Sequence, residues 1–137
     1  MTDKDKRYRY CPICAAPLTK QSINGENRKA CKKNSCDYIE WNNPTPVLAA
    51  IVQAADKIVL VRALGWPEDW FGLVTGFHES GETAEHGVAR EVKEELGLSC
   101  QVESLVGVYS FFQMNQVIIA YHVLLDKGDI TLDAREL

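Results

Sequence analysis

Apolar residues along this chain are arranged in runs that predict two pairs of β-strands. Val47 to Ala55 is an apolar run with the length of a buried strand, and Ile58 to Ala63 follows it after a turn at Asp56-Lys57. Val102 to Phe112 and Gln116 to Leu125 predict two further strands.

Between these pairs, one segment has the period of an amphipathic helix. Its apolar residues recur every four positions and form one stripe: Ala84, Val88, Val92 and Leu96. Thr83 can cap the first turn, and Gly97 stands where a left-handed residue commonly ends a helix. The order of strand, strand, loop, helix, strand, strand predicts an α/β or α+β layered fold.

The first forty residues have a different pattern, with few large apolar side chains. Asn24-Gly25 predicts a hairpin turn, and prolines interrupt regular structure at residues 42–46. The sequence therefore predicts a small unit at 1–42 and a larger domain at 43–137.

Charge separates the same two regions. Residues 1–40 carry nine Lys or Arg and five Asp or Glu, a balance of +4, whereas residues 41–137 carry six and fourteen, a balance of -8. An acidic domain does not attract a phosphate compound unaided, so divalent cations should mediate such a contact. Without a signal peptide or an apolar run near 20 residues, we expect a cytoplasmic protein without a membrane partner.

Four cysteines of the first region have the spacing of a metal site. Cys11 and Cys14 are separated by two residues, and Cys31 and Cys36 by four. This pattern fits a structural Cys₄ zinc ribbon, although unrelated buried thiols or a redox pair are alternatives. Cys100 lies far away, and we expect it in the core.

The predicted helix carries a cluster of carboxylates. Glu91, Glu94 and Glu95 stand at positions i, i+3 and i+4, which share one helix face. Like charges so close destabilise a helix, and Mg²⁺ would compensate by binding carboxylate and phosphate oxygens together. The alternative is an acidic face that is merely solvated.

The segment from Gly76 to Leu98 resembles the signature of the Nudix hydrolase family. It follows the pattern of Gly, five residues, Glu, seven residues, Arg-Glu, an aliphatic residue, any residue, Glu-Glu, any residue, Gly and an aliphatic residue. The resemblance implies an α/β/α sandwich and hydrolysis of nucleoside diphosphate-linked compounds by water attack at phosphorus, with Mg²⁺ or Mn²⁺. Such folds usually continue past residue 137 with a strand and a helix, so we expect the C-terminal part to be missing.

The resemblance also assigns roles by position. Glu91 and Glu95 match the principal metal ligands, Glu94 stands close behind, and the carbonyl of Thr75 is expected to face the metal. Glu82 and Arg90 match positions that are structural as well as site-forming. Which glutamate activates the water is left open.

A zinc ribbon before such a domain resembles the NADH pyrophosphatase and ADP-ribose pyrophosphatase relatives within the family. The proline- and tryptophan-rich stretch of the first group is absent, because residues 109–116 stand in its place. The residues before the signature also depart from the Leu-Pro-Ala-Gly form common there. NADH specificity is therefore not predicted, and a dinucleotide or nucleotide sugar such as NADH, NAD or ADP-ribose is the expected substrate.

Aromatic and amide residues near the signature are candidates for substrate contact: Trp70, Phe71, Phe77, Phe112 and Gln116. Packing of Trp70 on the core is the alternative for that residue.

A second hypothesis assigns binding rather than catalysis to the chain. The ribbon would grip nucleic acid or protein through residues such as Lys29, Lys32 and Lys33, and the Nudix fold would sense a nucleotide. The complete glutamate cluster argues for the enzyme. The sequence leaves a homodimer open.

Overall fold

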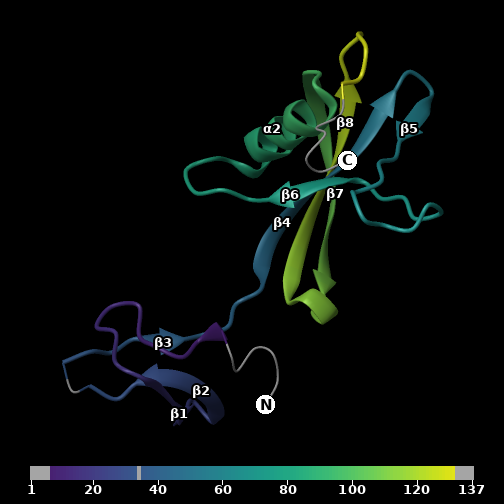
Figure 1. Cartoon of the computed structure of the whole chain (residues 1–137). Coiled ribbons are helices and arrows are strands. Elements are labelled where there is room, and N and C mark those ends of the chain that lie inside the picture. The colour runs from purple at the N-terminus through teal and green to yellow at the C-terminus, as the bar shows by residue number, and fades with distance from the viewer. Residues whose placement is uncertain (1–6, 34, 132–137) are drawn as a thin grey trace. The chain divides into compact units, whose positions relative to one another are not determined.

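The chain folds into two compact units, Met1–Asn43 and Pro44–Leu137 (Figure 1). The computed structural model describes residues 7–33 and 35–131. The expectation about the C-terminal strand and helix concerns the end of the chain, where residues 132–137 lie outside the described part.

The first unit is a three-stranded antiparallel sheet in the order β1-β2-β3, which comprises Leu18–Ile23, Glu26–Cys31 and Ile39–Glu40. Asn24 and Gly25 join the first two strands with φ angles of 52° and 84°. Positive φ at both central residues matches the twist of a tight hairpin, so the predicted turn is confirmed.

The second unit contains a mixed sheet in the order β5-β4-β8-β7, and β6 also pairs with β4. The strands are β4 (Thr45–Ala54), β5 (Lys57–Val59), β6 (Val74–Phe77), β7 (Cys100–Phe111) and β8 (Gln116–Leu125). β4 and β8 run parallel, and all other pairs are antiparallel. The first half of β4 pairs with β6 and its end pairs with β5, so these two strands share one edge of β4.

One strand is shorter than the sequence predicts. The segment from Ile58 to Ala63 was expected to be a strand throughout, but β5 ends at Val59 and Val61 makes only an isolated bridge with Gly72. The chain leaves β4 there because β6 pairs with the preceding part of the same edge, from Ala50 to Val47.

The predicted helix is confirmed as α2, Ala84–Leu96. The hydroxyl of Thr83 accepts a hydrogen bond from the N–H of His86, and Gly97 ends the helix with φ 75°. The helix lies against one face of the sheet in Figure 1. The core between them consists of buried residues from α2, β4, β6 and β8: Leu48, Ala50, Val52, Val74, Val88, Val92, Leu96, Tyr121 and Val123.

Sheet and helix give the α/β Nudix-type layering, with Cys100 packed at the margin of this core. The described residues of the second unit contain one α-helix, so one of the two helical layers that the resemblance implies is observed. No helix among the described residues is both long and apolar enough to cross a bilayer.

Candidate active site and cysteine cluster

Glu91 and Glu95 of α2 lie in the protein interior rather than in solvent. They retain 8% and 4% of their exposed area, although both are carboxylates. Glu91 lies directly against Gly76 of β6, where a Cβ atom would overlap its carboxylate. Gly76 is therefore required by the close approach of β6 to the helix. Buried carboxylates are costly unless they are paired, so the surroundings must compensate for their charge.

Arg90 is the compensating cation for Glu91. Its Nε and Nη2 atoms donate to the two carboxylate oxygens of Glu82 at 3.0 and 2.8 Å, which is the bidentate geometry that guanidinium favours. Its Nη1 donates to Glu91 at 2.8 Å and to Glu94 at 3.2 Å. One arginine therefore ties the loop before α2 to two carboxylates of the helix.

The same guanidinium extends to β6 and to the loop before the helix. Nη2 donates to the backbone carbonyl of Phe77 at 3.2 Å, and Nη1 lies 3.7 Å from the carboxylate of Glu79. These two partners were not predicted, because a backbone carbonyl and a loop carboxylate leave no spacing signal in the sequence. These contacts fix the end of β6 and the following loop against α2.

Glu82 is fixed as an anion at this junction. Its hydrogen bonds from Arg90 and from the backbone N–H of Glu79 lower its pKa from 4.5 to about 2. The same contacts raise the pKa of Arg90. The ring Nε2 of His78, to which the sequence assigned no role, lies 3.0 Å from the carbonyl of Glu82. The loop is thus held by charge at neutral pH.

The remaining carboxylate has a different environment. The side chain of Glu94 keeps 54% of its exposed area, so it faces solvent while Glu91 and Glu95 are buried. The predicted cluster therefore has two inner members and one outer member on the same stretch of helix.

The residues predicted to bind substrate lie in three places. Trp70 and Phe71 are both 59% exposed on the loop before β6. Phe77 ends β6, and its carbonyl contacts Arg90. Phe112 and Gln116 flank the tip of the β7–β8 hairpin, where Phe112 is 84% exposed. Figure 1 shows this tip projecting away from α2, so the structure does not gather the five residues at one point.

A cleft of about 640 Å³ opens beside the C-terminal end of α2. Its walls include Val61, Trp66, Phe71, Leu96 and Ile130. Of the residues of α2, Leu96 lines this cleft, whereas Glu91, Glu94 and Glu95 do not. The ring of Trp66 packs over Gly72, which accounts for a glycine there because a Cβ atom would lie 3.2 Å from the ring.

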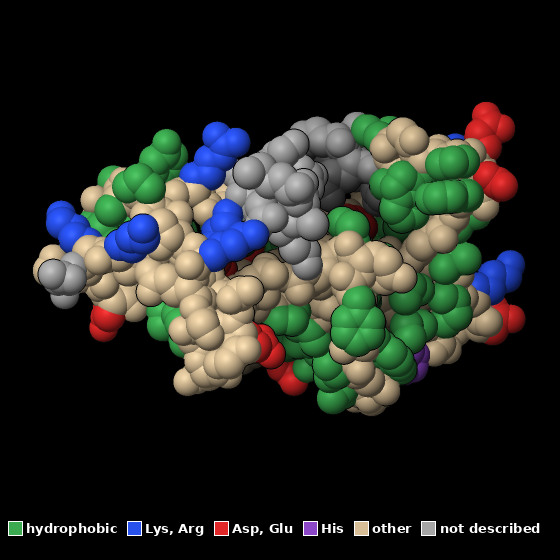
Figure 2. All heavy atoms as spheres, turned by 90° about the horizontal axis from the view of Figure 1, so that it is seen from below, with side chains coloured by type: hydrophobic (Ala, Val, Ile, Leu, Met, Phe, Trp, Pro, Cys, Tyr) green, Lys and Arg blue, Asp and Glu red, His purple; other side chains and the backbone are tan. Residues whose placement is uncertain are grey.

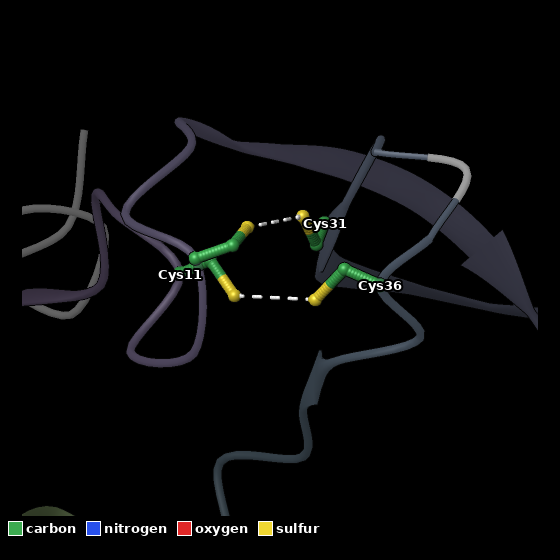
Figure 3. A group of neighbouring side chains, drawn as sticks. Cys11, Cys31 and Cys36 are labelled. Carbon is green, nitrogen blue, oxygen red and sulfur yellow. Dashed lines mark hydrogen bonds between the residues drawn. The ribbon is translucent and has the colours of Figure 1, made fainter.

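The cysteines of the first unit converge, as Figure 3 shows for the labelled Cys11, Cys31 and Cys36. The Sγ atoms of Cys11 and Cys36 are 3.6 Å apart, and those of Cys14 and Cys31 are 3.5 Å apart. Four sulfurs at 2.3 Å from one zinc ion would be about 3.8 Å apart. None of the five cysteines is joined in a disulfide bond.

The backbone around the cysteines is arranged to support a charged sulfur. Burial would raise the pKa of Cys11, but hydrogen bonds from the N–H groups of Cys14 and Ile13 lower it to about 7. The N–H of Tyr38 lowers the pKa of Cys36, yet burial and the neighbouring sulfurs raise it to about 12. Four adjacent thiols cannot all ionise without a cation, and a divalent metal such as zinc would supply that charge.

Among the described residues, these cysteines are the one group of metal-ligand types whose donor atoms all lie within 4.8 Å of one another. The glutamates of α2 do not converge as closely. Arg90 already bonds to Glu91 and Glu94, and a cation would have to draw the carboxylates together.

Comparison with known proteins connects this site to a family. The family model of the NUDIX domain matches residues 43–136. A curated relative, the NAD-capped RNA hydrolase NudC of Pseudomonas entomophila, is 24% identical over 132 residues, which cover 96% of this chain and 46% of the relative. NudC of Mycobacterium tuberculosis strain H37Rv is 36% identical over 83 residues, covering 61% of this chain and 26% of that protein. The chain thus spans less than half the length of these relatives.

Solved structures show that the similarity extends to most of the chain. A NUDIX hydrolase from Nitrosomonas europaea superposes with a TM-score of 0.82 at 26% identity, covering 94% of this chain and 74% of that one. A UDP-X diphosphatase gives a TM-score of 0.60 at 26% identity, covering 76% and 51%. The first of these similarities includes the cysteine unit as well as the sheet and helix.

Proposed function

This chain belongs to the Nudix family, and we propose that it hydrolyses the pyrophosphate bond of a nucleoside diphosphate-linked compound with the help of a divalent cation. The observation that supports this most is the placement of two buried carboxylates, Glu91 and Glu95, on a helix whose entry loop is fixed by Arg90. Such an arrangement is costly for a purely structural helix and useful for a metal site.

The residues present fit a hard cation in their chemistry. Glu91, Glu95 and Glu94 offer carboxylate oxygens, and the backbone carbonyl of Thr75 offers a fourth oxygen on neighbouring β6. The glycine at 76 leaves space beside Glu91 that any other side chain would fill. Mg²⁺ or Mn²⁺ held there would polarise a phosphoryl oxygen and lower the pKa of a bound water.

The chain's own residues would perform the remaining tasks. Arg90 orients Glu91 through its 2.8 Å hydrogen bond and keeps Glu82 ionised as a structural anchor. Glu94, the exposed member, is accessible to hold or accept a proton from an attacking water. No histidine or cysteine is required for this chemistry.

For the substrate, we propose a dinucleotide or a nucleotide sugar. Relatives act on NAD-capped RNA, and a structural neighbour is a UDP-X diphosphatase. Trp66 and Phe71 line the cleft at the C-terminal end of α2, and their rings would pack against a planar base or the sugar attached to it. We expect NADH not to be favoured strongly over ADP-ribose.

For the first unit, we propose one structural zinc ion bound by Cys11, Cys14, Cys31 and Cys36. Four thiolates fill a tetrahedral site and leave no position for a reacting water. The sulfur distances and the N–H groups aimed at Cys11 support this assignment.

The experiment is a screen of NADH, NAD, ADP-ribose, UDP-sugars and nucleoside triphosphates with the full chain, with and without Mg²⁺. We expect Mg²⁺-dependent release of a nucleoside monophosphate, and Glu95→Gln should lower kcat by at least about a hundredfold. Glu85→Gln is the matched control, because Glu85 is on the same helix and contacts Tyr121 instead. Wild-type turnover in Glu95→Gln, activity confined to triphosphates, or a hundredfold preference for NADH would contradict the proposal.

A further inference from the structure

The first unit contains a cleft of its own, built from cationic and aromatic side chains. It has a volume of about 450 Å³, and its walls include Tyr8, Lys20, Arg28, Lys29 and Trp41. Tyr8 is 36% exposed and Trp41 is 43% exposed, although the unit has few large apolar residues to spare. The cleft opens where β3 ends at Glu40 while the neighbouring β2 continues back to Glu26.

Arg28 and Trp41 form a rigid pair within this cleft. The guanidinium carbon lies 4.9 Å from the centre of the indole ring, and Nη1 donates to the carbonyl of Trp41 at 3.0 Å. The buried Nε of Arg28 has no hydrogen-bond partner. The pair therefore keeps an exposed aromatic ring in place beside a guanidinium group.

Lys20 and Lys29 stand directly opposite one another on β1 and β2. Like charges at opposed positions of an antiparallel pair share one face of the sheet and destabilise it. The Nζ atom of Lys29 is held by the carbonyl of Tyr8 at 3.0 Å, and Lys20 has no ion pair among the described residues. A phosphate group in the cleft would face these two ammonium groups and the guanidinium of Arg28, which line the same walls.

The acidic side chains at the cleft are already engaged. Glu26 accepts from Arg28 at 3.2 Å, and Glu40 accepts from the hydroxyl of Tyr38 at 2.6 Å and from the backbone N–H of Asn42 at 2.8 Å. Residues 1–40 keep a balance of +4. Lys and Arg side chains (blue) are spread over the first unit, at the left of Figure 2.

From these features we propose that the first unit is a binding site for single-stranded nucleic acid. A phosphate would lie between Lys20 and Lys29, and a neighbouring base would stack on the exposed ring of Trp41. Stacking on an aromatic ring beside cations is the usual way in which proteins bind single strands with little sequence preference. A duplex cannot offer an unstacked base, so it would bind more weakly. The site is separate from the proposed hydrolysis and does not depend on it.

The test is fluorescence anisotropy with the full chain in a buffer that contains zinc but no added Mg²⁺. The probes are fluorescein-labelled ten-nucleotide single-stranded RNA, single-stranded DNA and a duplex of the same length. We expect saturable binding of both single strands, at least about tenfold weaker binding of the duplex, and a Kd that rises with KCl. Trp41→Ala should weaken binding about tenfold, and Trp41→Phe should restore most of it. Lys20→Ala should make the Kd depend less on the KCl concentration. Lys57→Ala removes the same charge from β5 and should leave that dependence unchanged.

Zinc content and far-UV circular dichroism of each variant show whether the unit is still folded. Equal binding by wild type, Trp41→Ala and Lys20→Ala would overturn the proposal, as would preference for the duplex or an equal effect of Lys57→Ala. The Glu95→Gln variant separates the two proposals, because it should lose hydrolysis and keep this binding. Binding without hydrolysis in the wild type would leave this site standing and refute the proposed enzyme.

Discussion

The two units of this chain differ in the amount of apolar surface that stabilises them. The second unit has a core of nine buried residues between sheet and helix. In the first unit, the buried apolar residues among those described are Cys11, Ala30 and Cys31, and two of the three are cysteines. Burial of so little apolar area cannot offset the entropy of ordering some forty residues, so we expect the proposed zinc ion to supply the difference.

The units also differ in how they treat charge before any metal binds. In the second unit, Arg90 satisfies Glu82 and Glu91 within the protein. In the first, four cysteine sulfurs lie within 4.8 Å of one another. Zinc should therefore decide whether the first unit folds, whereas Mg²⁺ should decide only whether the second unit works. The following predictions test this difference, from the largest expected effect to the smallest.

Cys14→Ser should remove the metal and the fold of the first unit together. Structural zinc contributes on the order of 10 kcal/mol to small units of this kind, which is more than a three-stranded sheet can supply by itself. We expect zinc to fall from about one per chain to near zero, with the β4–β8 sheet still protected in hydrogen exchange. The control is Cys100→Ser, which should keep full zinc. A Cys14→Ser chain with full zinc would contradict the assignment.

Gly76→Ala should impair catalysis more than stability. The added Cβ atom overlaps the Glu91 carboxylate, which must then move away from β6. A displacement of about 1 Å in a reacting group can cost about a hundredfold, so kcat should fall on that scale. Turnover and Mn²⁺ affinity, measured by electron paramagnetic resonance, provide the check. Unchanged values for both would show that this close approach has no role.

Arg90→Gln should lower the stability of the second unit without changing its zinc content. It leaves Glu82 and Glu91 without their shared cation, and we expect the free energy of unfolding to fall by about 2 kcal/mol in urea titrations. Arg90→Lys should recover less than half of this loss, because an ammonium cannot match the bidentate geometry at Glu82. Full recovery by lysine would indicate that charge alone is sufficient.

Glu82→Gln should have a smaller and pH-dependent effect. The pKa of Glu82 is lowered from 4.5 to about 2, so its ionised form stabilises the fold above pH 4.5 and loses this contribution as the pH falls toward 2. The melting temperature of the variant should lie several degrees below that of the wild type at pH 7, and the gap should narrow between pH 4.5 and 3. A gap that stays constant over this range would refute the pKa argument.

Local signals in the sequence were sufficient for the helix and most strands. Thr83 and Gly97 mark the two ends of α2 as predicted, and Gln116–Leu125 is a strand over the predicted range. β6 was missed because four residues interrupted by Gly76 lack an alternating pattern. The parallel pairing of β4 with β8 depends on contacts across the sheet that no local pattern specifies.

The site was predictable to the extent that it lies on one helix. The i, i+3, i+4 spacing placed the glutamates together, and position in the signature placed Glu82 near Arg90. The sequence predicted that Mg²⁺ would compensate the repulsion on this turn, and the structure shows that Arg90 also bonds to Glu91 and Glu94. The contact between Arg28 and Trp41 was not predicted, because the two residues are thirteen positions apart and the connection between β2 and β3 lies between them.

The parallel pairing at the centre of the sheet has a consequence for synthesis. β4 begins at Thr45, but its partner β8 begins at Gln116, so their hydrogen bonds cannot form until most of the chain has left the ribosome. The β1–β2 hairpin closes over a two-residue turn and needs no such delay. Contacts between distant residues slow folding, whereas local ones form early. We therefore expect the first unit to bind the proposed zinc ion while the second unit is still an unfolded nascent chain.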